Sequence, residues 1–146
     1  MPDPTEPSQP PPPPPSPGPE TSATSQSTGL PSNVAAAIAC IPLIGGIIFY
    51  ILEKRDNFVR FYAMQSIIFG GIWVLFDIVS RIVLMIFSSV PAIGGFLAVL
   101  WGLIALLVHL AFLVIFIVTI IKAFTNVRWD IPYIGPLARK QLGEAV

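Results

Sequence analysis

Residues 53–66 read EKRDNFVRFYAMQS, and this stretch is the one charged segment between two long apolar runs. Residues 34–52 before it carry no charge, and residues 67–76 after it carry none either. Charged residues between hydrophobic segments mark a turn outside the lipid, and basic residues there indicate which side of a bilayer the turn faces. The stretch therefore decides how the rest of the chain is oriented.

The composition is that of a membrane protein. Of the 146 residues, 54% are hydrophobic and 11% are charged, whereas soluble domains carry about a quarter charged residues. Because a lipid-facing surface needs apolar side chains, we predict an all-α polytopic membrane protein. The chain has one cysteine, Cys40, and one histidine, so neither an intramolecular disulfide nor a transition-metal site within a single chain is expected.

A proline-rich tail precedes the apolar runs. Residues 1–31 hold twelve of the sixteen prolines, six of them in a row at positions 10–15. Proline cannot donate a backbone hydrogen bond and the segment has little to bury, so we predict a disordered tail over residues 1–33. A proline-binding groove of the SH3 type could bind it, but no Lys or Arg flanks the prolines, so we favour a spacer.

Three apolar runs are long enough to cross a membrane, and we predict three transmembrane helices. The first covers residues 34–52, with a kink at Pro42. The second covers about residues 60–87 and the third about residues 96–121. Together they form a transmembrane domain over residues 34–124.

Capping and turn residues mark the ends of these helices. Asp56 or Asn57 can cap the second helix, because a short side-chain oxygen accepts hydrogen bonds from the free amides of the first turn. The pattern Pro-x-Ile-Gly recurs at Pro42, Pro91 and Pro132. Since the segments between them do not match, we interpret these as three separate breaks and not as an internal repeat.

The basic residues predict the orientation. They gather in the charged stretch and after the third helix, whereas the tail and the second turn have none. Under the positive-inside rule, the charged stretch and residues 125–146 then lie at the cytoplasmic side and the N-terminus lies outside. These basic residues are Lys54, Arg55, Arg60, Lys122, Arg128, Arg139 and Lys140.

Three ionisable residues fall within the predicted helices, where such groups are costly and therefore candidates for function. Asp77 and Arg81 stand four residues apart, which favours an ion pair on one helix face. Counted from the cytoplasmic ends, Asp77 and His109 reach depths of about 22 and 20 Å, so the two helices could bring them together. The cluster is either a packing stripe closed by the Asp77–Arg81 pair, which we favour, or a hydrophilic path.

The charged stretch resembles the signature of a bacterial family of small membrane proteins of unknown function. The usual form of that signature is a Lys, an acidic residue, Phe-Val-Arg-Phe-His-Ala and then Gln-Ser; here Tyr62 stands in place of the His. The family is related to the twenty-kilodalton component of the chloroplast inner-envelope import translocon and to magnetosome size-control membrane proteins. The residues that carry the resemblance are Lys54, Arg55, Asp56, Phe58, Arg60 and Gln65.

The resemblance covers about residues 34–140 and implies residence in a bacterial cytoplasmic (inner) membrane. Its plastid branch implies protein import through a protein with four spans, from which our count of three departs. Neither the import role nor the magnetosome role can be assigned to particular residues of this chain.

The sequence contains no catalytic or phosphate-binding pattern, so we expect no enzyme and no cofactor. We expect a scaffold or assembly subunit that acts through helix–helix association in the lipid bilayer. Its partners would be further copies of itself or other membrane proteins, and not nucleic acid. The alternative is a pore or translocation component, suggested by the matched depths of Asp77 and His109 and by the plastid relatives.

Overall fold

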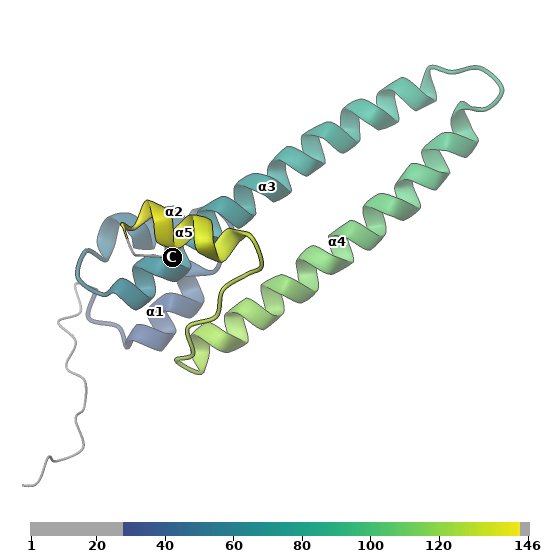
Figure 1. Ribbon diagram of the computed structural model, residues 1–146. Helices are drawn as coiled ribbons and strands as arrows, with labels where there is room; N and C mark the ends of the chain where they lie inside the picture. Colours follow the sequence, from purple (N-terminus) through teal and green to yellow (C-terminus); the bar gives the residue numbers. More distant parts are fainter. Residues whose placement is uncertain (1–27, 144–146) are drawn as a thin grey trace, which may run out of the picture.

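The structure, a computed structural model, describes residues 28–143. Over this range the chain is all-helical and contains no strand. The tail predicted to be disordered lies outside the described residues, except for positions 28–33. The helices are α1 (Ser32–Ala39), α2 (Ile44–Leu52), α3 (Asn57–Ser88), α4 (Gly94–Phe124) and α5 (Ile134–Gln141) (Figure 1).

The two longest helices, α3 and α4, form an antiparallel hairpin (Figure 1). Asp56 caps α3, since its Oδ1 accepts hydrogen bonds from the amides of Phe58 at 2.8 Å and Val59 at 3.3 Å, which confirms the predicted cap. Both helices are long and apolar enough to cross a membrane. The 32 residues of α3 rise about 48 Å, so the helix is longer than a bilayer core is thick. Both helices are a few residues longer than predicted.

The single helix predicted over residues 34–52 is wrong, because α1 and α2 replace it. They contain 8 and 9 residues, well short of the roughly 20 that a crossing helix needs. Pro42 ends α1 where only a kink was expected, and Leu43 after it has a positive φ of 62° that reverses the chain. The hydroxyl of Thr28, before α1, donates to the carboxylate of Glu53, after α2, at 3.4 Å. The segment therefore leaves from the same end of the molecule at which it enters.

The same type of turn connects α1 to α2 and α3 to α4, and it also precedes α5. In each case the amide two residues after the proline donates to the proline carbonyl at 2.8 Å, and the residue between them has a positive φ. This is γ-turn geometry, which is rare and strained for a side-chain-bearing residue. The Pro-x-Ile-Gly pattern thus encodes one repeated turn. The three turns are Pro42-Leu43-Ile44, Pro91-Ala92-Ile93 and Pro132-Tyr133-Ile134.

The glycine that closes this pattern lets the second helix of each hairpin pass close to the first. A Cβ on Gly45 would collide with the backbone carbonyl of Ile38, and one on Gly94 would collide with the carbonyl of Phe87. Each glycine therefore stands seven residues after the carbonyl that it approaches. This shared contact makes α1–α2 a short counterpart of α3–α4.

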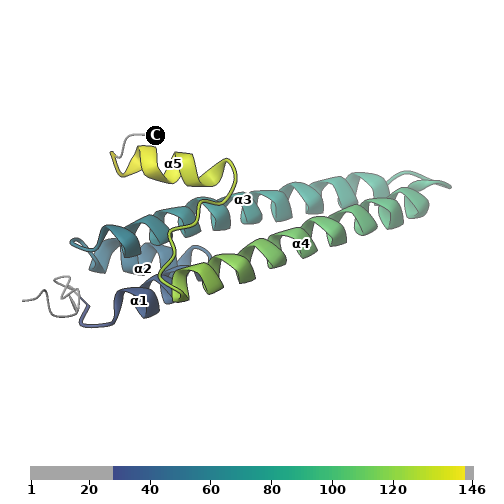
Figure 2. The same ribbon diagram turned by 60° about the horizontal axis from the view of Figure 1, so that its bottom comes forward.

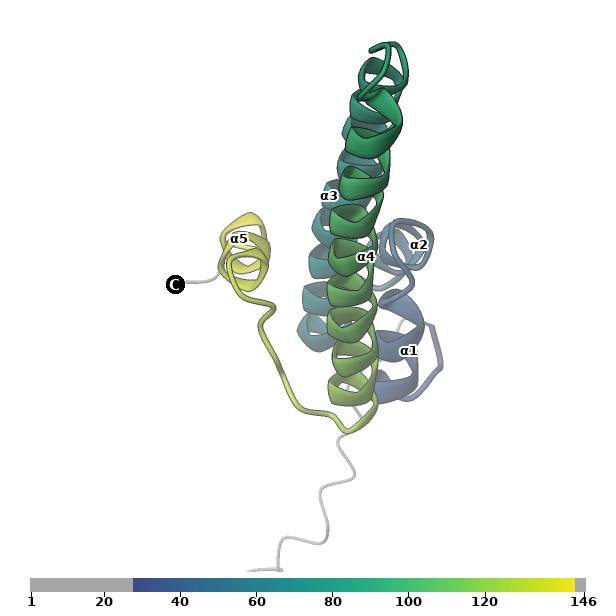
Figure 3. The ribbon, with the colours of Figure 1, turned by 90° about the vertical axis from the view of Figure 1, so that its right-hand side faces the viewer.

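The short helices surround one end of the long hairpin. We call this end the base; it comprises the first half of α3, the second half of α4 and the elements packed on them. α1 contacts both α3 and α4, α2 contacts α3, and α5 contacts α3. Figures 2 and 3 show α1 and α2 on one face of the long hairpin and α5 on the opposite face. Beyond the base, α3 and α4 continue as a pair, and no other helix of residues 28–143 lies beside them.

The core of the base is built on small residues. Ala35, Ala36 and Ala39 of α1 are buried against Phe61 and Ala63 of α3. Small side chains allow helices to approach closely, so van der Waals packing can hold them together in lipid as well as in water. The buried core thus sits in the base, whereas in the outer half of the long hairpin most residues are exposed and only Ser80 and Gly94 are buried.

Candidate functional site

Two side chains of the charged stretch fasten the C-terminal segment to α3. Gln65 accepts from the amide of Ile131 through Oε1 at 3.2 Å and donates through Nε2 to the carbonyl of Trp129 at 3.4 Å. The Tyr62 hydroxyl donates to the carbonyl of Val127 at 2.5 Å and accepts from the amide of Trp129 at 3.1 Å. The extended residues 127–131 therefore receive from α3 the hydrogen bonds that a helix would make internally.

Two carboxylates of the same stretch are buried in the base. Glu53 accepts from the amides of Arg55 and Asp56, both at 3.2 Å, and Asp56 caps α3. Both acids therefore bind backbone amides, while the neighbouring Lys54 and Arg55 side chains are exposed. The exposed charged side chains of this stretch are therefore basic.

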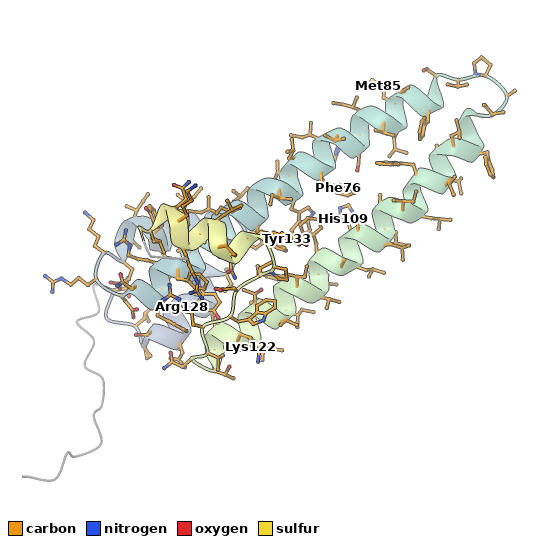
Figure 4. The ribbon with its side chains drawn as sticks, viewed as in Figure 1. Phe76, Met85, His109, Lys122, Arg128 and Tyr133 are labelled. Atoms are coloured by element: carbon orange, nitrogen blue, oxygen red, sulfur yellow. The ribbon has the colours of Figure 1, made fainter. Side chains whose placement is uncertain are left out.

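A second set of contacts holds α5 against the segment that precedes it and against α3. The Arg139 guanidinium forms a two-point ion pair with Asp130, with Nη2–Oδ2 at 2.6 Å and Nε–Oδ1 at 3.2 Å. The guanidinium carbons of Arg128 and Arg139 lie 4.4 and 5.8 Å from the centre of the buried Phe61 ring. Such cation–π contacts are favourable within about 6 Å. Figure 4 shows Arg128 at the base, near Lys122.

The candidate site lies farther out, between the long helices, where Asp77 of α3 meets His109 of α4. His109 Nε2 is 3.1 Å from Asp77 Oδ1, and His109 Nδ1 is 2.7 Å from the carbonyl oxygen of Ala105 in the preceding turn. The structure thus brings together the two residues whose depths were matched from the sequence. Their side chains are still 46% exposed for Asp77 and 35% exposed for His109.

The hydrogen-bond partners of His109 constrain which ring nitrogen carries a proton. A carbonyl oxygen can only accept, so Nδ1 must be the donor to Ala105. The contact between Nε2 and Asp77 is then a hydrogen bond only if a second proton sits on Nε2 or on the carboxyl group. In either case the pair as a whole is neutral, which suits a site surrounded by apolar side chains.

Aromatic rings enclose this pair on the sides that face the base. The rings of Phe76 and Trp73 lie 5.5 and 6.2 Å from the His109 ring, both edge-on. Phe112 stacks on Trp73 at 5.8 Å. Figure 4 shows Phe76 and His109 facing each other between α3 and α4. Sequence reasoning missed this enclosure, although Trp73 and Phe76 are spaced three residues apart around the face that carries Asp77.

Arg81 does not take part in the pair. The ion pair predicted between Asp77 and Arg81 does not form, because the carboxylate turns toward α4 and bonds to His109 instead. Among residues 28–143 the Arg81 guanidinium has no hydrogen-bond or ion-pair partner, and its side chain is exposed. The structure therefore unites two of the three predicted site residues and leaves the third as an uncompensated cation.

The donor set of this site suits protons and polar contacts. In the described range, no cluster of three or more His, Cys, Asp or Glu side chains could hold a metal ion. Asp77 offers its second carboxylate oxygen, Oδ2, for a further hydrogen bond, since a carboxylate can accept several. The arrangement can therefore bind a cationic or hydrogen-bond-donating side chain of a neighbouring helix.

Comparison with known sequences identifies a family. The chain matches the magnetosome magnetite crystal formation protein family over residues 25–138. A UPF0132 membrane protein of Methanocaldococcus jannaschii is 38% identical over 116 residues, which are 78% of this chain and 91% of the relative. A UPF0132 membrane protein of Archaeoglobus fulgidus is also 38% identical over 116 residues, 78% of this chain and 98% of the relative.

A second UPF0132 membrane protein of Methanocaldococcus jannaschii is 32% identical over 117 residues, 80% of this chain and 74% of the relative. No solved structure matches the chain. These three relatives are archaeal, so the expected bacterial origin is not supported, and none of the matches bears on the expected relation to the plastid translocon.

Proposed function

We propose a function from one premise: the chain belongs to the magnetosome magnetite crystal formation protein family. Its relatives are named as membrane proteins, and two of its helices are long and apolar enough to span a bilayer. On this basis the chain is a non-enzymatic integral membrane protein that acts as a scaffold or assembly subunit through helix–helix association.

The observation that carries this proposal is the exposed polar pair on the outer half of the long hairpin. Asp77 and His109 lie among apolar side chains of α3 and α4, yet about half and a third of their side-chain surfaces are uncovered. In a bilayer, polar side chains of this kind find partners on neighbouring helices and mark the faces by which helices associate. A pore or translocation role has no comparable observation in its favour.

The fold also supports a proposed topology that differs from the predicted one. Because Thr28 and Glu53 meet, the short hairpin α1–α2 dips into the membrane and returns, and only α3 and α4 cross it. Seven of the eight Lys and Arg residues lie in or next to the base, and Arg81 is the exception. Under the positive-inside rule the base then faces the cytoplasm, together with Thr28 and Gly143 at the two ends of the described range.

Crosslinking in membranes tests the proposed function. Two copies of the full chain with different affinity tags are expressed together, treated with a membrane-permeant lysine- or carboxyl-reactive crosslinker, and purified through one tag. We expect either the second tag or a specific set of other membrane proteins in the purified complex. A protein that stays monomeric and without partners, both after crosslinking and in mild detergent, would contradict the scaffold role.

A further inference from the structure

The chain after α4 runs back along the long hairpin before α5 begins. α4 ends at the edge of the base, where the carbonyl of Phe124 accepts a hydrogen bond at 3.1 Å from the side chain of Asn33, near the start of α1. Ile131 and Ile134, by contrast, pack against Phe69, which lies about 18 Å along α3 from its first residue. Figure 2 shows the connection between α4 and α5 advancing along the hairpin toward the far turn.

α5 then returns toward the edge of the base. It begins at Ile134, beside Phe69, and near its end the guanidinium carbon of Arg139 lies 5.8 Å from the centre of the Phe61 ring. From Phe69 to Phe61 the distance along α3 is about 12 Å. Residues 127–141 thus run along the hairpin and come back, as α1 and α2 do on the opposite face (Figure 3).

α2 and α5 lie at the same level of α3. The residue before α2, Leu43, lies beside Gly70, and Gly46 within α2 lies beside Ala63. Like α5, α2 therefore begins near Phe69 and runs back toward the start of α3. Helices that span a bilayer tilt by only about 20° on average. Two elements at one level of a spanning hairpin thus lie in the same layer of the bilayer, and the surroundings of α2 indicate those of α5.

The outer faces of both helices suit lipid. Every exposed side chain of α2 is an isoleucine or leucine, as a surface in contact with acyl chains requires. Next to α5, Tyr133 is 90% exposed, and Leu137 in its middle is exposed too. Lys140 is exposed in its last turn. The outer face of α5 is thus apolar at the end nearer the far turn and basic at the edge of the base, the order expected between acyl chains and headgroups.

The extended residues 127–131 have the hydrogen bonds that lipid demands. Irregular backbone is tolerated at membrane depth only where protein groups satisfy its amides and carbonyls. In Val127, Trp129 and Ile131, both the amide and the carbonyl are hydrogen-bonded. Their partners are the carbonyl of Lys122, the hydroxyl of Tyr62, the side-chain amide of Gln65 and the backbone amide of Gly135. In water these protein partners would be dispensable, because water could satisfy the same groups.

The charges of the segment are compatible with this placement as well. Asp130 and Arg139 form an ion pair with each other, so together they add no net charge. The guanidinium of Arg128 lies over the ring of Phe61, only four residues into α3. The charges that the segment does not pair within itself therefore lie at the edge of the base, where headgroups and water are within reach.

We propose that residues 127–141 form a second re-entrant segment, which enters the bilayer from the side of the base and leaves on the same side, and that Tyr133 and Leu137 contact lipid acyl chains there. The segment expected at the cytoplasmic surface then belongs to the membrane domain. This inference rests on the proposed topology, in which α3 and α4 cross the bilayer, and is independent of the scaffold role.

Thiol labelling tests this placement. Single-cysteine variants of the full chain are made in a Cys40→Ala background. Tyr133→Cys and Leu137→Cys report on α5, Ile44→Cys reports on the short hairpin α1–α2, and Lys54→Cys, at an exposed position of the charged stretch, is the water-facing control. A membrane-impermeant maleimide is added to permeabilised membrane vesicles, so that it reaches both sides of the bilayer. Full labelling after denaturation confirms that each thiol is intact.

We expect Tyr133→Cys, Leu137→Cys and Ile44→Cys to react at least tenfold more slowly than Lys54→Cys, because only the charged thiolate reacts and lipid disfavours it. Fast labelling of both α5 positions, with slow labelling at Ile44→Cys, would overturn the second re-entrant segment and leave the dipping α1–α2 hairpin in place. Fast labelling at all three positions would overturn both. The scaffold function is judged separately, by the crosslinking of tagged copies.

A nitroxide attached to Tyr133→Cys distinguishes lipid from a partner protein as the cover. Molecular oxygen concentrates among acyl chains, whereas a hydrophilic nickel chelate stays in water, so the rates of collision with the two report the surroundings of the label. After reconstitution into phospholipid vesicles, we expect frequent collisions with oxygen and rare collisions with nickel. Rare collisions with both would mean that protein covers this position, and frequent collisions with nickel would place it in water; either result would overturn the lipid contact.

Discussion

The side-chain carbonyl oxygen of Gln65 accepts a hydrogen bond from the backbone amide of Ile131, which lies 66 residues later in the chain, at 3.2 Å. Its amide nitrogen donates to the carbonyl of Trp129, so one fully buried side chain satisfies two backbone groups of an extended segment. The charged stretch therefore has a structural role that its charges do not reveal: it holds the C-terminal segment on the base.

Replacing Gln65 tests that role. Gln65→Leu keeps the approximate volume but removes both hydrogen bonds, and a buried amide left unpaired costs about 1–3 kcal/mol. We expect the segment that includes α5 to detach, which limited proteolysis in membrane vesicles detects as faster cleavage between α4 and α5. Gln141→Leu, an exposed position on α5, serves as the control. Equal cleavage rates for the two variants would contradict the assigned role.

Gly94 at the start of α4 and Gly71 within α3 predict a sharp contrast between alanine substitutions. Gly94→Ala places a Cβ against the backbone carbonyl of Phe87, which cannot move without opening the turn. Overpacking of this kind costs about 1–3 kcal/mol. Thermal unfolding in mild detergent, followed by circular dichroism, should show a lower Tm. Gly71→Ala, where a Cβ meets nothing within 4 Å, should leave the Tm unchanged or slightly raised.

The proposed topology predicts where tags are accessible. Short tags inserted at residue 10 and added after residue 146 should both react with a membrane-impermeant reagent from the cytoplasmic side, because α1–α2 returns to the side at which it enters. A cysteine in place of Ser89, in the turn between α3 and α4, should react from the opposite side in a Cys40→Ala background. Labelling of the two tags from opposite sides would support three spans and would contradict the proposal that α1–α2 leaves the membrane on the side at which it enters.

The Asp77–His109 contact predicts a measurable coupling energy. Asp77→Asn, His109→Gln and the double variant form a cycle whose interaction term we expect near 0.6 kcal/mol and below about 1.7 kcal/mol, the range found for hydrogen bonds between membrane helices. Unfolding in graded mixtures of mild and denaturing detergent supplies the free energies. Purely additive single effects would show that the contact contributes nothing to folding.

Much of the fold follows from local sequence. Asp56 marks the start of α3, and the absence of any proline or glycine pair within residues 96–121 correctly predicts α4 as one helix. The error over residues 34–52 arises because hydrophobic length alone cannot distinguish one long helix from two short ones. The information was present in the recurrence of Pro-x-Ile-Gly, because the same pattern that reverses the chain at Pro91 reverses it at Pro42.

In the candidate site too, features that depend on local sequence could be predicted, whereas features that depend on contacts between distant segments could not. The depths of Asp77 and His109 follow from counting along two helices, so their meeting could be anticipated. Local spacing also favoured an Asp77–Arg81 pair, but the carboxylate bonds across the hairpin instead, where His109 can share a proton with it. The hydrogen bonds of Gln65 could not be predicted, since they depend on where residues 127–131 lie in space.

The short hairpin α1–α2 has a further consequence for the membrane itself. With the base on the cytoplasmic side, as proposed, the protein is broad in the cytoplasmic leaflet and only two helices wide in the other. An inclusion with this wedge shape fits best where the broader leaflet is convex. From this proposed orientation we expect the protein to favour bilayers that bulge toward the cytoplasm, and we expect such curvature to favour the presence of the protein.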